Sequence, residues 1–428
     1  MTQPKLRVLF CDHLNLARGK SIPLNNAENN EARFCQSTFA VTYDKDLIPA
    51  PGAKMMQGLP DMVARFKREE IRPDWQPGSS VVIADLFENN GSPLPMCGRT
   101  LLRRSIREWQ ALGYQPKVGI ELEAYAFTIT DGEQVEPMET PGAYVYSTGP
   151  FADPTGFTDA IWARAEQAGF NLEMITSEYD APQYEFTLRY DDALKAVDDI
   201  FLFRLMARET ALEYGVLLTF VPKAIEGKGG SGFHVNFSFS DADGRNVIAD
   251  AEASDGLSSL ARGCIAGLMF HHSAMAGLLA PCVNSYERLQ PASLSGYWRN
   301  WGFDHRGVTT RVASESAERA RIEHRMADGA ANPYTAVATV LQAAKLGVER
   351  QYELPPAETG DCFENTDAKE GVPENLGAAL DALQGDTTLT EAVGQTLVEN
   401  LVFIKRDEIE KTAALEGQSL RDFYIHYI

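Results

Sequence analysis

An apolar, strand-like segment with acidic side chains at alternate positions places the strongest constraint on this chain. In KVGIELEAYAF, at 117–127, Glu121 and Glu123 are two residues apart. Side chains two apart on a β-strand point to the same face of a sheet. On an inward face the two carboxylates would repel each other and lose hydration, which is costly unless a cation compensates. The segment therefore predicts a sheet with a cation-binding face. The alternative is a half-exposed sheet whose acidic face is in contact with solvent.

Further candidate metal ligands lie on other strand-like segments. Glu178 and Glu185 flank the turn YDAPQ, and Glu185 begins the apolar run EFTLRY. His234 lies in GFHVNFS and Glu323 in RIEHR. Carboxylates with one imidazole suit Mg²⁺ or Mn²⁺ rather than zinc, because hard oxygen ligands dominate. One ion could hardly use five carboxylates, so the set favours a site of two or three ions. Strand alternation puts further polar side chains beside these ligands, namely Asn236, Ser238, Arg321 and Arg325.

Arginines are concentrated in the stretch that holds Glu323. Guanidinium groups bind carboxylate and phosphate through paired hydrogen bonds, so arginines near metal ions indicate phosphoryl transfer. A salt-bridged surface is the alternative. The glycine loop GKGGSG at 227–232 lacks the Lys-Ser/Thr of a Walker A motif, and a hairpin turn explains it as well. The arginines concerned are Arg288, Arg306, Arg311, Arg321 and Arg325.

The order of periodic segments predicts an α+β protein of two domains, 1–97 and 98–428. The first domain is expected to be small and rich in β-structure, and no internal repeat is visible. Expected strands span 5–11, 79–87, 117–127, 183–190, 217–224 and 232–240. Expected helices span 59–70, 99–113, 157–168, 191–215, 256–280 and 333–351, with a helical end from about 375.

Charge and cysteine usage restrict the partners. The formal net charge of −21 leaves no basic stripe for phosphate backbones, which argues against nucleic acid. The six cysteines form no C-x-x-C pair and indicate reduced thiols rather than a zinc site or a disulfide framework. The opening MTQPKLRVLF lacks the long apolar region of a secretory signal. We therefore expect a cytoplasmic protein without a membrane partner.

The order of these motifs resembles that of the glutamine synthetase family over nearly the whole chain. The family's G-x-E-x-E strand matches 119–123, and E-x-x-P-G-Q-x-E matches 178–185 with Pro182 in place of glycine. K-P…G-S-G-x-H-V matches 223–235, N-S-Y-x-R-L-x-P matches 284–291, and R-x-x-x-x-R matches 306–311. R-I-E-x-R and A-N-P-Y match within 321–334, and FCDHLNLARGK resembles the family's small β-grasp domain.

The resemblance implies a curved antiparallel catalytic sheet flanked by helices, ATP as a substrate, and Mg²⁺ or Mn²⁺ as cofactor. It implies a ligase that phosphorylates a glutamate-like acid and transfers the acyl group to an amine. Family members assemble as stacked rings, so a homo-oligomer, specifically a dodecamer, with sites between adjacent subunits is expected. It assigns Glu123, Glu178 and Glu185 to one metal ion and Glu121, His234 and Glu323 to the other. It assigns Arg288, Arg325 and Gly230 to the acid, and Tyr190, Asn236, Ser238, Arg306, Arg311 and Arg321 to ATP. Among these, Arg306 and Arg325 would be catalytic together with Asp12, which would reach into a neighbouring subunit's site.

One departure from the family pattern bears on the acceptor. Members that use ammonia carry a flap glutamate six residues after the arginine of N-S-Y-x-R, where this chain has Leu294. Leucine makes the amine pocket larger and less polar, and Tyr297, Trp298 and Trp301 could add aromatic walls. We therefore expect an organic amine and a γ-glutamylamide product. Gly229 in place of an asparagine and Asn236 in place of a histidine also depart from the pattern.

Three competing interpretations remain from the sequence. The first is true glutamine synthesis with ammonia and an altered flap. The second is a non-catalytic structural or binding relative, which would be expected to have lost metal ligands. The third is an ATP:guanidino phosphotransferase, which would need no β-grasp domain and would usually carry a reactive cysteine in its site.

Overall fold

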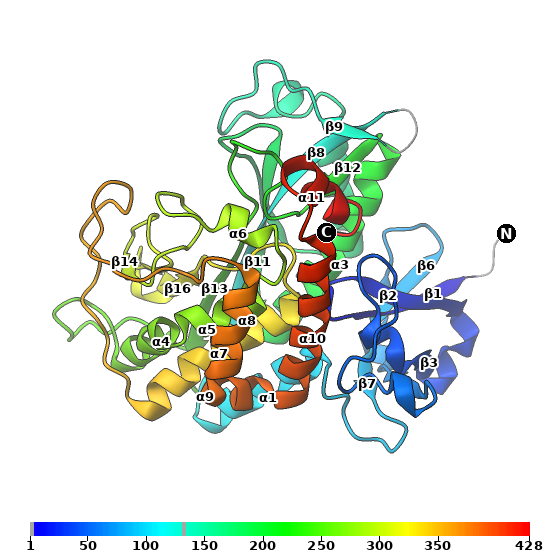
Figure 1. The fold of residues 1–428 in the computed structure, drawn as a ribbon, viewed down its shortest axis with the longest axis horizontal. Coiled ribbons are helices and arrows are strands. Elements are labelled where there is room, and N and C mark those ends of the chain that lie inside the picture. Colours follow the sequence, from blue (N-terminus) through cyan, green and yellow to red (C-terminus); the bar gives the residue numbers. More distant parts are fainter. Residues whose placement is uncertain (1–3, 131–133) are drawn as a thin grey trace.

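The computed structural model describes residues 4–130 and 134–428 and shows a small β-domain beside a large α/β-domain (Figure 1). The small domain holds a four-stranded sheet in the order β2 (Ala17–Pro23), β1 (Lys5–Cys11), β6 (Ser79–Ile83), β5 (Arg72–Pro73). Its second sheet has the order β3 (Glu31–Cys35), β4 (Asp61–Arg65), β7 (Asp85–Phe87). The pair β1–β6 is parallel and the other pairs are antiparallel. Short 3₁₀ turns are η1 (Leu24–Asn29), η2 (Gln36–Ala40), η3 (Met55–Gln57) and η4 (Arg68–Glu70).

The helix expected over 59–70 is wrong. Residues 61–65 form strand β4, which pairs with β3 on one side and β7 on the other. Its central residues Met62, Val63 and Ala64 are all buried. Backbone hydrogen bonds from both neighbours and burial of both faces therefore outweigh the local helix preference of the segment.

The large domain is built on one sheet that carries the candidate site. Its strand order is β10 (Leu172–Ser177), β11 (Gln183–Asp192), β8 (Gln115–Ile129), β13 (Phe233–Ser240), β16 (Arg321–His324), β15 (Thr310–Ala313), β14 (Trp301–Phe303). Strands β9 (Val135–Pro137) and β12 (Val216–Thr219) also pair with β8. The pairings are antiparallel except β14–β15, which is parallel, so the expected antiparallel sheet is confirmed apart from this edge. The strand expected over 217–224 ends at Thr219, three residues before Pro222.

Strand β8 shows why the sheet has two different faces. Val118, Ile120, Leu122 and Ala124 are at most 2% exposed and form the core side. Residues 119, 121, 123 and 125 alternate with them and face the other way. The apolar face secures the strand, which leaves the opposite face available for the acidic side chains.

Helices pack on the core side of the sheet and around one another (Figure 1). Helix α3 (Ala193–Glu213) contacts β8, β11 and β12, and α2 (Phe157–Ala168) packs on α3. At the start of α7 (Pro333–Arg350), the Asn332 side chain accepts hydrogen bonds from the Tyr334 and Thr335 amides. The remaining helices are α1 (Gly98–Ala111), α4 (Ser259–Phe270), α5 (His272–Leu279), α6 (Ser285–Arg288), α8 (Leu376–Gly385), α9 (Thr387–Val393), α10 (Gln395–Thr412) and α11 (Gly417–Tyr424), with 3₁₀ turns η6 (Gly149–Phe151) and η7 (Ala317–Arg319).

The single helix expected over 256–280 is two helices, α4 and α5, which meet at His271. The buried His271 Nδ1 lies 2.5 Å from Asp386 Oδ2, at the N-cap of α9. This pairing gives a buried polar ring a partner at the point where the helix changes direction. None of the helices among the described residues is long and apolar enough to cross a membrane.

The division expected at 97/98 falls between the last strand of the small domain and the first helix of the large one. Strand β7 ends at Phe87 and α1 begins at Gly98. The exact boundary remains a prediction.

Candidate active site

His234 is the centre of the ligand cluster on the polar face of the large sheet. It lies on β13, opposite Glu121 of β8 in the antiparallel register. His234 Nδ1 is 3.1 Å from Glu121 Oε2 and 3.7 Å from Glu323 Oε1. One ligand atom from each of the three residues lies within 4.8 Å of the others, so they could hold one metal ion. The structure thus brings together the three residues expected to share this ion.

A second cluster lies on the other side of His234. Glu185 is paired with Glu123 across β11 and β8, and ligand atoms of Glu123, Glu185 and His234 lie within 4.8 Å of one another. His234 Nε2 is 3.8 Å from Glu123 Oε1. Glu178, the third residue expected here, follows β10 at the start of the turn, and its carboxylate and that of Glu123 repel each other. Adjacent β-pairing therefore brings Glu123 and Glu185 together beside His234, and the assignment of Glu178 to this ion stays a prediction.

Charge crowding perturbs the acids of the second cluster. Burial and repulsion from Glu121 raise the pKa of Glu185 to about 7, and burial with repulsion from Glu123 raises that of Glu178. Burial also opposes ionisation of Glu121, but a hydrogen bond from His234 lowers the Glu121 pKa to about 2. Clustered carboxylates with raised pKa values are poorly compensated by protein charges. The donor set therefore fits hard divalent cations, which would relieve this repulsion.

Two arginines compensate Glu323. Arg311 Nη1 is 3.1 Å from Glu323 Oε2, and Arg325 Nη1 donates to Glu323 Oε1. Arg325 Nη2 also donates to the Leu294 carbonyl at 3.4 Å. Both guanidinium groups are thus in place next to a metal ligand, where they could neutralise charge on a phosphoryl group or a carboxylate.

Arg288 lies below the glycine loop, fully enclosed by protein. Its Nη1 donates to the Met326 carbonyl at 2.8 Å and its Nη2 to the Arg325 carbonyl at 3.1 Å. A Cβ added at Gly230 would lie 2.4 Å from Arg288 Cγ, so only glycine lets the loop approach this closely. Arg288 and Gly230 are together, as expected, and Arg288 also supports the backbone of Arg325.

The glycine loop is tied to the turn that carries Glu178. Asp180 Oδ2 accepts from the Gly229 amide at 2.5 Å, and Tyr125 Oη donates to the Gly229 carbonyl at 3.0 Å. Gln183 Nε2 donates to the Gly230 carbonyl at 3.0 Å and contacts Glu123 Oε2 at 3.5 Å. These bonds place the loop and the second ligand cluster in one rigid unit.

A cavity of about 590 Å³ adjoins Glu121 and is lined by β8, β11, β13 and β16. Asn236 connects it to the ligands, since Asn236 Nδ2 donates to Glu121 Oε1 at 3.1 Å and Arg321 Nε donates to Asn236 Oδ1 at 3.2 Å. The cavity has the volume of a small-molecule site. Four residues expected to bind nucleotide line it, namely Tyr190, Asn236, Ser238 and Arg321.

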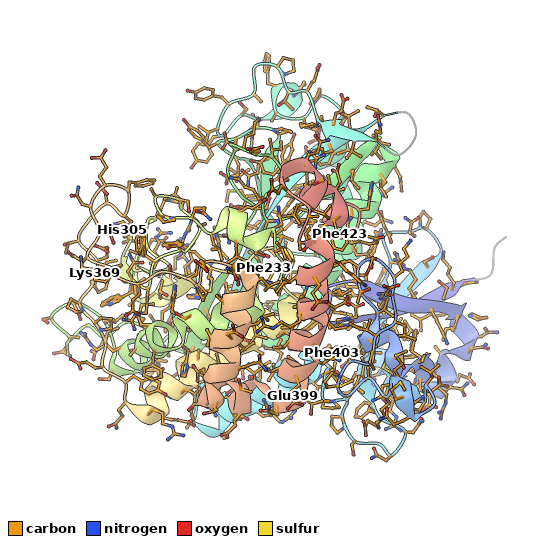
Figure 2. The ribbon with its side chains drawn as sticks, in the orientation of Figure 1. Phe233, His305, Lys369, Glu399, Phe403 and Phe423 are labelled. Carbon is orange, nitrogen blue, oxygen red and sulfur yellow. The ribbon has the colours of Figure 1, made fainter. Side chains whose placement is uncertain are left out.

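Other expected site residues lie elsewhere. Arg306 is exposed on the loop after β14 and is near enough to Glu178 for its charge to lower the Glu178 pKa, against the larger effect of burial. Leu294 is 47% exposed. The aromatic walls expected beside it are not formed by Trp301, which is buried and donates to the Pro355 carbonyl at 2.8 Å. In Figure 2, His305 and Lys369 lie together at the edge of the molecule, where the loop after β14 and the strap before α8 run side by side.

The side chain of Asp12 is completely buried in the single chain, and its expected role at a neighbouring subunit's site stays a prediction. Its carboxylate accepts hydrogen bonds from the amides of Leu14 and Leu16 at 2.9 Å each, and from Arg18 Nε at 2.6 Å. Asp12 therefore stabilises the turn between β1 and β2.

Two residues of the site were not foreseen. Gln183 is two residues before Glu185 on β11, so strand alternation alone could have placed it on the ligand face. Asp180 carries no such signal, because it lies in an irregular turn whose direction depends on the tertiary fold.

Known proteins resemble this chain in sequence and in fold. The glutamine synthetase catalytic domain matches residues 95–421. The glutamine synthetase of Halobacterium salinarum is 28% identical over 98% of this chain and 93% of its own length. The gamma-glutamylethanolamide synthetase GlnA4 of Streptomyces coelicolor is 30% identical over 90% of this chain and 84% of its own. A structure described as a GmaS/ADP complex superposes with a TM-score of 0.84 at 25% identity, over 98% of this chain and 96% of the other.

These matches agree with the site geometry. The matched region contains the two metal-capable clusters, the arginines and the cavity next to Glu121. Family members use ATP and divalent metal ions and act on small molecules. The chain belongs to the glutamine synthetase family and is an ATP-dependent ligase that joins glutamate to ammonia or an amine.

Proposed function

We propose that the protein phosphorylates the γ-carboxylate of glutamate with ATP and joins it to an organic amine, giving a γ-glutamylamide, ADP and phosphate. The feature that supports the choice of amine is Leu294, at the position where the resemblance to the family implies the flap glutamate of ammonia-using members. A leucine can neither bind ammonium through charge nor accept a proton from it, but it leaves room for carbon substituents. A relative named for gamma-glutamylethanolamide synthesis supports the same choice.

The residues divide the reaction into two steps. In the first, the γ-carboxylate oxygen attacks the terminal phosphorus of ATP; a P–O bond forms, the bond to ADP breaks, and an acyl phosphate results. Arg311 and Arg325 next to Glu323 would neutralise the charge that moves with the phosphoryl group. In the second step the neutral amine attacks the acyl carbon. A C–N bond forms, the C–O bond to phosphate breaks, and the departing phosphate takes the proton that the nitrogen loses.

Divalent ions, when bound, would supply charge neutralisation for the phosphates. We propose that Glu121, His234 and Glu323 hold one, and Glu123, Glu185 and Glu178 another. The ring of His234 lies between the two clusters, so its orientation affects both. ATP would occupy the 590 Å³ cavity, with its base against Tyr190 and its phosphates toward Glu121 and Arg321. Arg306 would reach the phosphates from the exposed loop.

The acid would lie beside the glycine loop. Gly230 sits directly over Arg288, and Arg325 is anchored to Glu323 and to the Leu294 carbonyl. If one carboxylate of the glutamate substrate is held between this loop and Arg325, its γ-carboxyl group would point toward the ligand clusters. Hydrogen bonds from Asp180, Tyr125 and Gln183 keep the loop in place.

We also propose a homo-oligomer of stacked rings, a dodecamer, in the cytoplasm. The resemblance to the family, whose members assemble as stacked rings, supports this assembly. All six cysteines are unpaired, which fits a reducing compartment. Mass photometry would give the assembly size directly.

Phosphate release measured with ATP, Mg²⁺, glutamate and a panel of acceptors tests the proposal. We expect kcat/KM for at least one primary alkylamine to exceed that for ammonia. A clear preference for ammonia would favour the glutamine synthetase alternative, which the similarity to the Halobacterium salinarum enzyme supports. Absence of ATP turnover with every acceptor would favour a non-catalytic relative.

A further inference from the structure

An organic acceptor needs space for its hydrocarbon group, and the aromatic side chains near Leu294 in the sequence do not line such a space. Trp301 is buried with its indole nitrogen bonded to the Pro355 carbonyl. Tyr297 and Trp298 pack against each other with ring centroids 4.8 Å apart, and the Tyr297 ring lies against Gly371. These rings therefore pack on the segment 355–372 and do not form a wall for the hydrocarbon group of the acceptor.

A large cavity is present on the far side of the turn that carries Glu178. It has a volume of about 760 Å³ and is lined by residues of 137–145, by 179–182 and by Lys228 (the loop cavity). Its wall is shared with the active site, because Asp180 lines the cavity while its Oδ2 holds the Gly229 amide at 2.5 Å. Glu178, the proposed metal ligand, precedes this wall by two residues. The cavity is thus separated from the acid site by one turn of chain.

The lining fits an amine with an apolar body. Tyr144 and Tyr179 are 75% and 79% exposed and offer ring faces to an ammonium group or a hydrocarbon chain. Three prolines and Met138 add apolar surface. The acids Glu139 and Asp180 outnumber the single lysine of the lining, Lys228, whose ammonium is directed to the Ala181 carbonyl. The charge balance favours a cation, and the volume far exceeds the space of about 30 Å³ that one water-sized molecule takes.

We propose that the loop cavity binds the hydrocarbon group of the acceptor. The acceptor class is then a primary alkyl or arylalkyl amine of several carbons. Asp180 would hold its ammonium group at the shared wall before the amine reaches the acyl carbon. This inference rests on the proposed function, because it assigns a place and a size to the organic amine. It makes Asp180 a specificity-determining residue as well as a support of the glycine loop.

An acceptor size series tests the loop cavity in the full-length enzyme. Wild-type kcat/KM, measured by phosphate release, is expected to rise about tenfold or more from methylamine to phenethylamine, since each buried methylene contributes to binding. Ala143→Trp, which fills the cavity from an exposed loop, should lower kcat/KM for phenethylamine about tenfold while changing that for methylamine less than about threefold. Val145→Trp fills the same cavity from the next inward position and serves as the second variant. Leu212→Trp on α3, outside both sites, should keep the wild-type series.

The outcomes separate the two proposals. Equal losses for both amines in Ala143→Trp and Val145→Trp, or no loss in either, would overturn the loop cavity while leaving an organic acceptor in place. A wild-type enzyme that prefers an organic amine without any rise along the series would do the same. A wild-type preference for ammonia over every amine would overturn the proposed function itself, and the cavity assignment with it.

Discussion

Replacing Glu185 by glutamine should stabilise the metal-free protein and destabilise the metal-loaded one. Glu185 lies opposite Glu123 on the ligand face, and burial with repulsion from Glu121 raises its pKa to about 7. The ordinary value is 4.5. Between these values the folded protein binds a proton that the unfolded chain does not, so stability falls as pH rises through this window.

The pKa difference sets the magnitude. It corresponds to about 3 kcal/mol of lost stability at pH 8 and about 1 kcal/mol at pH 5.5. Glutamine has nearly the same shape and no charge, so Glu185→Gln should recover most of this loss at pH 8. Mg²⁺ at 1,000-fold excess over the wild-type dissociation constant should reverse the order. Wild type then gains about 4.1 kcal/mol, which exceeds the loss at pH 8, whereas the variant lacks one ligand and gains little.

Thermal unfolding in EDTA and in excess Mg²⁺, at pH 5.5 and pH 8, measures both effects. We expect the variant to melt higher than wild type in EDTA at pH 8, with a smaller difference at pH 5.5, and to melt lower in Mg²⁺. Glu391→Gln, an exposed glutamate on α9, is the matched control and should change neither value. The reasoning is refuted if Glu185→Gln melts at or below wild type in EDTA at pH 8.

Three further outcomes follow from the structure. Glu323→Ala should weaken Mg²⁺ binding by at least about 100-fold in calorimetry, because it removes a ligand that two arginines position; unchanged affinity would exclude Glu323 as a ligand. Leu294→Glu should raise the ratio of kcat/KM for ammonia to kcat/KM for an alkylamine about tenfold, as expected for one added charged hydrogen bond. An unchanged ratio would show that residue 294 does not determine the choice of acceptor. Gly267→Ala should cost about 1–3 kcal/mol in urea unfolding, because a methyl there would lie 2.0 Å from the Ala343 carbonyl; Gly385→Ala, where a methyl meets nothing within 4 Å, is its control.

The sequence was most informative where one local period determined the structure. The alternation of buried and acidic residues in β8 gave both the strand and the face of Glu121 and Glu123, because a strand buried on one side leaves little choice of register. Helix α3 was predicted equally well, from the helical spacing of its apolar residues and from the glycine that follows it.

Other features depended on contacts between distant segments. Strand β4 was mistaken for a helix because its pairing with β3 and β7 is absent from the local pattern. The break at His271 depends on Asp386, which is 115 residues away. Burial of Asp12 likewise depends on the fold of the turn and on its packing, and neither can be predicted from a sequence motif.

The sequence predicted which residues form the site better than it predicted how their side chains are arranged. Motif order gave six candidate ligands, and the β8–β13, β8–β11 and β13–β16 pairings explain why four of the carboxylates meet around His234. The hydrogen bonds of Asp180 and Gln183 to the glycine loop were not predictable, since they depend on how a turn and a loop fold back on the sheet.

A direct competition in one reaction tests the central claim. Wild-type enzyme, ATP, Mg²⁺ and glutamate would be incubated with equal concentrations of ammonia and phenethylamine, and both products quantified by mass spectrometry. We predict that the γ-glutamylamide of the organic amine predominates and that neither product forms without Mg²⁺ or ATP. Glutamine as the main product would contradict the account.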